Sequence, residues 1–343
     1  MTKRKERMGV KKLVPLMLAF LMTLVLVTGG GCSSQTEKKS PTPPPEKLTV
    51  NVAALRGPTA LSMVKMMESK PALGEEVTTN YQILETPDLL TSKLVSKEVD
   101  IAALPTNMAA SLYNKGVPYQ LAAMSSWGVM YAVSNGETVN SWADLKGKTV
   151  YVVGKGATPD IVFRFLLSKN GLNPDTDVKL DYTLDQVQAA QSLIAGRIKL
   201  AVLPEPWVTQ ALKGSNTCKV ILDLQEEWKK VVGKDVALAQ TCLVVKKDLA
   251  AKHPNVVAAF LSAYKDSIDW ANQNPSAAGQ LAEKLGVGMK APVAEAAIPR
   301  CNLRYEDAQT SKPAVEAFLK VLYDYAPQSI GGKMPDNDFY YKE

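Results

Sequence analysis

The central part of this sequence repeats one pattern at a constant spacing of 99 residues. Residues 52–59 (VAALRGPT) and 151–158 (YVVGKGAT) each join a short apolar run to a basic residue and a Gly-x-Thr ending. Residues 94–105 and 193–204 are related by the same spacing, and each ends in Leu-Pro after an apolar strand pattern. A shared spacing in two separate stretches predicts two lobes that have the same strand–helix plan.

Strand patterns alternate with helical patterns across most of the remaining sequence. Such alternation is typical of α/β lobes, for which we expect mostly parallel sheets. After Lys246 the spacing of apolar residues becomes helical. Besides the strands inside the repeats, the expected strands are 77–84, 119–125, 129–133, 149–153, 178–182, 219–224 and 237–245, and the expected C-terminal helices are 254–273, 275–285 and 312–325.

The first 32 residues have the features of an export signal. Residues 1–12 are basic, residues 13–27 are almost wholly apolar, and three glycines precede Cys32. The apolar run is shorter than the ~20 residues that a membrane-spanning helix needs. We predict a signal peptide over 1–31, followed by a site at Cys32 that resembles a bacterial lipoprotein cysteine carrying palmitate. Gly29 departs from the leucine usual at such sites, so an ordinary signal peptide and an uncleaved anchor stay as alternatives.

The segment after the cysteine is polar and rich in proline. Residues 33–47 (SSQTEKKSPTPPPEK) contain too few apolar side chains to form a core. We expect residues 32–47 to be a disordered tether that holds the folded part at the outer face of the cytoplasmic membrane.

The basic character of the sequence belongs mainly to the export signal. The formal charge is +6, but residues 1–31 hold six Lys or Arg against one Glu, which leaves 34 basic and 33 acidic residues in the remainder. A balance of this kind does not indicate a nucleic-acid partner.

The remaining cysteines and the single histidine do not form a known metal pattern. Cys218, Cys242 and Cys301 lack C-x-x-C spacing, so both one disulfide and three free thiols are compatible with the sequence. His253 precedes Pro254 at an expected helix start. We therefore predict neither a metal site nor a cofactor.

Five short stretches resemble a known family. They are 98–101 (EVDI), 141–148 (SWADLKGK), 203–207 (LPEPW) and the His-Pro and Asn-Pro pairs at 253–254 and 274–275. Residues 48–325 are similar to solute-binding proteins of ABC importers, and in particular to the nitrate/sulfonate/taurine family, which includes binders of thiamine-pyrimidine precursors.

The resemblance implies a type II periplasmic-binding-protein fold, with two α/β lobes and a ligand cleft between them. Lobe 1 would comprise 48–130 and 243–343, and lobe 2 would comprise 131–242, with crossing strands near 130–134 and 240–242. The resemblance also implies a small-molecule ligand, an ABC permease with its ATPase subunits as partners, and a monomeric binding protein outside the cytoplasmic membrane.

The ligand site of such a fold is expected beyond the carboxyl ends of the strands. Four strand ends meet this condition, at 55–59, 104–107, 154–158 and 203–207, and each is followed by a helix whose N–H groups favour an anion or a carbonyl. The candidate ligand-binding residues at these ends and near the crossings are Arg56, Gly57, Pro58, Thr59, Pro105, Thr106, Asn107, Ser125, Ser126, Trp127, Gly154, Gly156, Ala157, Thr158, Glu205, Trp207 and Thr241.

The roles of these side chains leave the chemistry of the ligand open. Arg56 suits a sulfonate-like or nitrate-like oxyanion, whereas Glu205 suits an amine or another donor. Trp127 and Trp207 would either stack on a planar heterocycle or pack in the core. Thr158, which precedes a proline, would either cap a helix or contact the ligand.

An enzymatic function is the main alternative to binding. The fungal thiamine-pyrimidine synthase, which has a related fold, carries a C-C-C-F-C run that this sequence lacks. A single histidine leaves little scope for a Ser-His-Asp arrangement. We predict a binding protein that is not an enzyme, with an enzyme on the same fold and a ligand-sensing lipoprotein as the alternatives.

Overall fold

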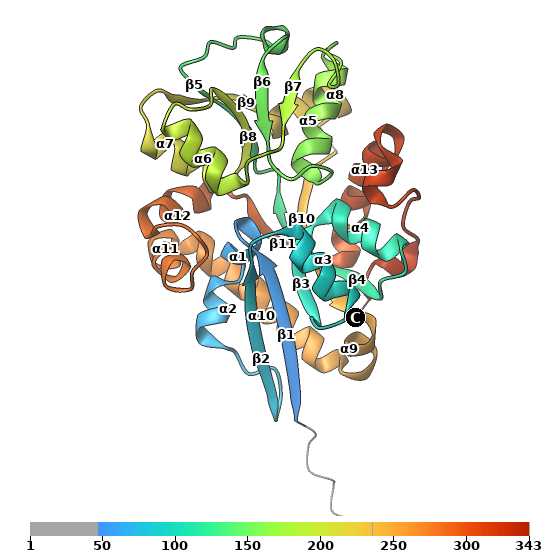
Figure 1. Ribbon diagram of the computed structural model, residues 1–343. Coiled ribbons are helices and arrows are strands. Elements are labelled where there is room, and N and C mark those ends of the chain that lie inside the picture. Colours follow the sequence, from blue (N-terminus) through green and yellow to red (C-terminus); the bar gives the residue numbers. More distant parts are fainter. Residues whose placement is uncertain (1–46, 235, 343) are drawn as a thin grey trace, which may run out of the picture. The chain divides into compact units, whose positions relative to one another are not determined.

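The chain forms two separate β-sheets, each with its own covering helices (Figure 1). The computed structural model describes residues 47–234 and 236–342, which belong to one compact unit, Pro45–Glu343. The predicted signal peptide, Cys32 and nearly all of the tether lie outside the described residues. The first sheet has the order β11 (Leu303–Asp307), β4 (Tyr119–Trp127), β10 (Ala239–Lys246), β3 (Ile101–Pro105), β1 (Leu48–Leu55) and β2 (Val77–Leu84). The second sheet has the order β7 (Lys179–Asp181), β6 (Thr149–Val152), β8 (Leu200–Pro204), β5 (Met130–Asn135) and β9 (Cys218–Asp223).

The helices divide between the two sheets, and we call each sheet with its helices a lobe. The first lobe contains α1 (Pro58–Leu61), α2 (Val64–Ser69), α3 (Pro87–Val95), α4 (Thr106–Asn114), α9 (Lys247–Lys252), α10 (Pro254–Gln273), α11 (Pro275–Lys284), α12 (Ala291–Ala297) and α13 (Ala308–Tyr325). The second lobe contains α5 (Thr158–Lys169), α6 (Gln186–Ile194), α7 (Trp207–Gly214) and α8 (Leu224–Val232). None of the helices among the described residues is both long and apolar enough to cross a bilayer. The predicted two-lobed α/β fold is confirmed.

The repeated sequence pattern corresponds to repeated structure. The strands β3 and β8 start 99 residues apart, and each lies beside the strand of the other repeat, β1 or β6. Val52 pairs with Ile101 in the first lobe, whereas Tyr151 pairs with Ala201 in the second. The two lobes thus share one plan, with a shift of one residue in the register of this strand pair.

The prediction of mostly parallel sheets is wrong. Four strand pairs are parallel, but β10 runs antiparallel to β3 and β4, β11 to β4, and β5 to β8 and β9. The reason is the connection between the lobes. Strands such as β1, β3, β6 and β8 run toward the other lobe, whereas β5 and β10 start where the chain has just crossed and therefore run away from it.

The chain crosses between the sheets at two places. The first crossing is the Gly128–Val129 turn between β4 and β5, where Gly128 has a φ of 63° and its carbonyl accepts a 2.6 Å hydrogen bond from Asn302 Nδ2. The second crossing follows α8 and ends at Ala239, the start of β10. Residues 239–242 therefore lie in a strand of the first sheet, earlier in the chain than the sequence analysis expected.

An aromatic cluster joins the lobes on one side. Phe165 of α5 lies 5.3 Å from Trp228 of α8 and 5.4 Å from Tyr325 of α13, measured between ring centroids. Trp228 in turn lies 5.6 Å from Phe318 of α13. Since α13 belongs to the first lobe and the other two helices to the second, this cluster makes the apolar core continuous across the lobes. The three cysteines of the folded part are buried free thiols.

Candidate ligand-binding cleft

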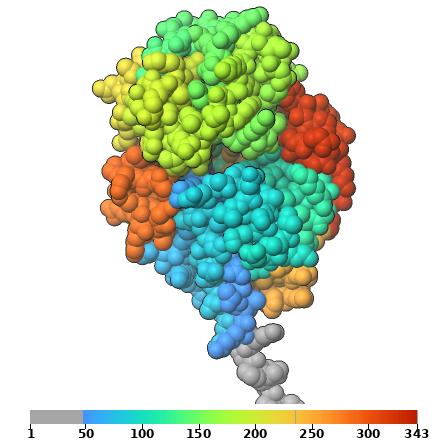
Figure 2. All heavy atoms as spheres, in the orientation of Figure 1, coloured from blue at the N-terminus to red at the C-terminus, as the bar shows by residue number. Residues whose placement is uncertain are grey.

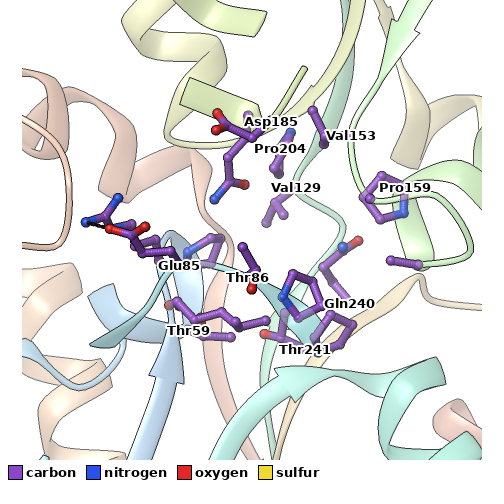
Figure 3. Close-up of a pocket in the computed structure, with 18 residues that line it drawn as sticks. Thr59, Glu85, Thr86, Val129, Val153, Pro159, Asp185, Pro204, Gln240 and Thr241 are labelled. Carbon is purple, nitrogen blue, oxygen red and sulfur yellow. Dashed lines mark hydrogen bonds and ion pairs between the residues drawn. The ribbon is translucent and has the colours of Figure 1, made fainter. Parts of the chain in front are cut away.

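The two lobes enclose a cavity of about 180 Å³ at the ends of the strands that point toward the opposite lobe. In Figure 2 a narrow opening is visible between the green second lobe and the blue-to-cyan first lobe. The predicted residues that line the cavity are Arg56, Pro58, Thr59, Pro105, Gly154, Ala157 and Thr241. The lining residues that the sequence analysis did not select are Leu55, Glu85, Thr86, Pro87, Val129, Val153, Pro159, Asp185, Gln186, Pro204 and Gln240 (Figure 3).

Several helices start at the cavity wall, and oxygen atoms of the chain already cap some of them. The Thr86 hydroxyl accepts a 3.3 Å hydrogen bond from the first turn of α3, and the Asp185 carboxylate accepts one of 2.8 Å from α6. In the first turn of α5, Asp160 accepts 2.8 Å and 2.7 Å hydrogen bonds from Gly156 N and the Tyr182 hydroxyl. The N-termini of α3 and α6 are therefore capped by side chains of the protein, whereas within the described residues those of α1, α4 and α5 have no side-chain cap.

Charged side chains lie at the mouth of the cavity. Arg56 Nη2 is 2.7 Å from Glu85 Oε1, and the Glu85 side chain is 66% exposed. Asp185 is a second exposed carboxylate in the lining. The lining therefore contains one cation and two carboxylates, and the cation is paired through Nη2, whereas Arg56 Nε has no hydrogen-bond partner among the described residues.

The floor of the cavity is formed by the start of β10. Gln240 and Thr241 are buried there, and among residues 47–234 and 236–342 Gln240 Oε1 has no hydrogen-bond partner. The Thr241 hydroxyl bonds to the hydroxyls of Ser125 and Ser126, at 2.8 Å and 2.6 Å. Ser125 and Ser126, predicted as ligand donors, lie outside the cavity lining and hold Thr241 from behind.

Two predicted residues, Asn107 and Thr158, join the lobes to one another through their side chains. Thr158 of α5 donates a 2.8 Å hydrogen bond to Asn107 Oδ1, and Asn107 Nδ2 donates one of 3.2 Å to the carbonyl of Gly156. Thr106, beside Asn107, is fully buried against Met124 Sδ. Gly57 has a φ of 105° at the start of α1, and a β-carbon there would lie 4.0 Å from the carbonyl oxygen of Glu205. Gly57, Asn107, Gly156 and Thr158 thus lie at the contact between the lobes, whereas Thr106 packs within the first lobe.

Glu205 also lies at this contact and outside the cavity lining. Its carboxylate is fully buried, 2.7 Å from Arg300 Nε, and accepts a 3.0 Å hydrogen bond from Thr209 N. Arg300 also stacks on the Tyr131 ring, at 4.9 Å from the ring centroid. Burial raises the pKa of Glu205, although the Thr209 hydrogen bonds and the Arg300 charge oppose this shift.

The two tryptophans predicted to stack on ligand do not line the cavity. Trp207 is fully buried in the core of the second lobe. Trp127 is stacked by the Arg304 guanidinium, 4.7 Å from the ring centroid, and lines a separate hollow with Lys229 and Lys234. Both positions agree with the core interpretation of these residues.

The lining residues missed by the sequence analysis carried usable signals. Thr86-Pro87 follows β2 with the same Thr-Pro pattern as Thr158-Pro159, and Asp185 begins a capping box with Gln188. Gln240 carried no such signal, because its role depends on where β10 enters the first lobe. Among residues 47–234 and 236–342, no group of three or more His, Cys, Asp or Glu side chains could hold a metal ion.

Two α/β lobes that are joined by two crossings and enclose a cavity at their strand ends define a two-lobed binding protein. The chain belongs to the NMT1-like family, whose model matches residues 42–286. The resemblance to solute-binding proteins of ABC importers that the sequence suggests is confirmed by this match and by the structural neighbours.

Solved structures of several such proteins are similar to this one. A protein described as an ABC transporter from Parabacteroides distasonis is 28% identical, with a TM-score of 0.70, over 86% of this chain and 99% of that chain. The alkanesulfonate-binding protein from Xanthomonas axonopodis pv. citri, bound to MOPS, is 16% identical, with a TM-score of 0.64, over 81% and 93% of the two chains. The periplasmic nitrate-binding protein from Synechocystis PCC 6803 is 14% identical, with a TM-score of 0.59, over 82% and 84%. The search of curated proteins found no match.

Proposed function

We propose that this protein is the extracytoplasmic solute-binding component of an ABC importer, which captures a small polar molecule between its lobes and delivers it to a permease. The observation that carries this proposal is the cavity walled by strand ends of both lobes. The names of the structural neighbours, which include an alkanesulfonate-binding and a nitrate-binding protein, support it.

The mechanism that we propose is closure of the lobes around the solute. A ligand that contacts both lobes binds the closed arrangement more tightly than an open one, and so shifts the population toward closure. The hydrogen bonds of Asn107 to Thr158 and Gly156 belong to this closed arrangement. The permease, with its ATPase subunits, would then recognise the closed form, and the binding protein itself needs no cofactor.

The export signal completes the proposal. Cleavage after residue 31 and lipidation of Cys32 would anchor a monomeric protein at the outer face of the membrane, with 33–47 as the tether. We expect Cys32→Ala to move the protein from the membrane fraction to the soluble fraction and to abolish palmitate labelling. Retention of Cys32→Ala in the membrane would contradict the lipid anchor and leave the binding function untouched.

The solute itself is best identified by mass spectrometry of molecules that co-purify with the protein. Ala157→Phe should remove the co-purifying ligand, because Ala157 lines the cavity and the larger side chain fills it. Ala195→Phe, at an exposed position of the same lobe, is the matched control.

Transport and turnover assays then test the function directly. Loss of uptake of the identified solute in cells that carry Ala157→Phe, with normal uptake for Ala195→Phe, would support the proposal. A chemically altered solute after incubation would instead indicate an enzyme, and uptake independent of the protein would favour a sensor.

A further inference from the structure

Three of the helices that start around the cavity have a proline in their first two positions, which reduces the number of backbone donors available to an anion. Pro58 and Pro87 are the first residues of α1 and α3, and Pro159 is the second residue of α5. Proline has no N–H group, so these three positions cannot contribute the backbone donors with which helix N-termini bind anions. Two further prolines, Pro105 and Pro204, end the strands β3 and β8 in the same wall.

The charges of the cavity also disfavour an anion. Arg56, the cation of the described lining, is engaged by Glu85 at 2.7 Å. An anionic ligand would have to compete with Glu85 for this guanidinium, while Asp185 repels it. A neutral or cationic ligand meets neither obstacle.

Deep in the cavity, one acceptor lacks a partner. Gln240 is 4% exposed and lines the cavity, and its Oε1 atom receives no hydrogen bond from the part of the chain that the structure describes. Figure 3 shows Gln240 on the other side of the cavity from Glu85. A buried carbonyl oxygen without a donor is unfavourable, so a ligand that supplies an N–H or O–H group at this point is favoured over one that does not.

The volume of the cavity and its apolar walls indicate the size and character of the ligand. A volume of about 180 Å³ is close to the ~150 Å³ of an engineered cavity that binds benzene. Leu55, Val129 and Val153, together with the prolines, make the walls largely apolar. Building on the proposed function, we infer that the cleft selects a small organic molecule, neutral or cationic, with a ring-sized apolar body and an N–H or O–H group that donates a hydrogen bond to Gln240 Oε1.

Three probes of nearly the same shape but different charge test this inference. We expect calorimetric titration of the full chain at pH 7 to show binding of benzamidine and benzamide at least about tenfold tighter than that of benzoate, with no binding of nitrate. Gln240→Met, which has a similar length and only a weakly accepting thioether sulfur, should weaken benzamide binding about tenfold, the loss expected for one buried hydrogen bond. Gln240→Glu, which keeps an acceptor oxygen and adds a charge, should tighten benzamidine and weaken benzoate.

Gln273→Leu, at the exposed end of α10, is the control and should leave every affinity unchanged. Tighter binding of benzoate or nitrate, equal affinities in Gln240→Met and the parent protein, or binding of none of the probes would overturn the inferred ligand class. The proposed function fails separately, if no solute co-purifies with the protein or if uptake does not depend on it. An anionic solute that is bound in the cleft and imported would therefore overturn this inference alone.

Discussion

The hydroxyl of Thr158 donates a 2.8 Å hydrogen bond to the side-chain carbonyl of Asn107, and this bond joins the first turn of α5 in one lobe to the first turn of α4 in the other. Both residues are buried, and Asn107 Nδ2 also donates to the carbonyls of Gly156 and Ser329, at 3.2 Å and 3.3 Å. Asn107 thus has all of its side-chain hydrogen-bonding groups engaged when the lobes are together. In the proposed closure mechanism, separation of the lobes would break this pair, so the pair would link ligand binding to closure.

We expect Thr158→Val to favour the open arrangement. Valine has nearly the same shape but no hydroxyl, so Asn107 Oδ1 loses its donor in the closed form at a cost of about 1–3 kcal/mol. Affinity for the ligand should fall about tenfold, and small-angle scattering of the ligand-free protein should give a larger radius of gyration. Thr49→Val is the control, because this substitution removes an exposed 3.1 Å hydrogen bond to Thr78 that lies within one lobe and does not join the two lobes. Unchanged scattering and affinity for Thr158→Val would mean that the bond does not contribute to closure.

The sequence predicts that Asn107 and Thr158 lie in the cleft, but it does not predict that they bond to each other. The strand ends and the glycine and proline turns identify Asn107 and Thr158 as cleft residues, because a parallel strand followed by a helix has only one end at which a loop can face the partner lobe. Which of the cleft side chains bond to one another depends on the distance between the lobes, and that distance is not encoded in local patterns. Both residues were therefore predicted as ligand contacts, whereas the structure engages them across the lobes.

The fold was more predictable than the site because helices and strands leave local signals in the sequence, whereas contacts between the lobes do not. Apolar periodicity and proline positions locate α10 at Pro254–Gln273 as expected from the sequence, because these signals are local. The edge strand β11 was missed, since Leu303–Asp307 has only five residues and follows a helical region. Gln240 was missed because its orphan oxygen becomes visible only when β10 is placed beside β3 and β4.

Arg300→Met should destabilise the protein by less than the about 3–5 kcal/mol lost when one partner of a fully buried ion pair is removed, because the Arg300 side chain is 38% exposed and its charge is partly screened by water. Glu205 is fully buried and would lose the guanidinium that lies 2.7 Å from its carboxylate. Urea denaturation at pH 7 measures the change in the free energy of unfolding. Arg304→Met is the control, because the side chain of Arg304 is 59% exposed and stacks on Trp127. Combining Arg300→Met with Glu205→Gln should recover part of the loss, and equal losses in the single and double variants would contradict this account.

The gap in stability between Glu205→Gln and the parent protein should depend on pH. Burial raises the pKa of Glu205 above its ordinary value of 4.5, against the opposing hydrogen bonds from Thr209 and the charge of Arg300. Below pH 4.5 the carboxyl is protonated in both the folded and the unfolded chain, so its contribution to stability is fully present. As the pH rises from there through the raised pKa of the folded state, the unfolded chain releases the proton first and that contribution is lost.

Thermal unfolding of both proteins from pH 4 to pH 8 tests whether the stability contributed by Glu205 falls as the pH rises. Glutamine does not titrate, so Glu205→Gln should gain stability relative to the parent protein as the pH increases. A difference in melting temperature that stays constant over this range, or that moves the other way, would show that burial does not dominate the ionisation of Glu205.

Gly279→Ala should destabilise the packing of α11 against α12. A β-carbon at Gly279 would lie 2.6 Å from the carbonyl oxygen of Ala291 and 3.0 Å from the backbone nitrogen of Glu295, and neither backbone atom can move without shifting α12. Overpacking of this kind costs about 1–3 kcal/mol, and the gain in helix propensity of about 1 kcal/mol offsets only part of it. Ser276→Ala, at an exposed position in the same helix, should change the free energy of unfolding by less than about 0.5 kcal/mol. Since α12 also contacts α7 of the second lobe, Gly279→Ala should weaken ligand binding as well, and unchanged stability in urea denaturation would show that the helices separate at little cost.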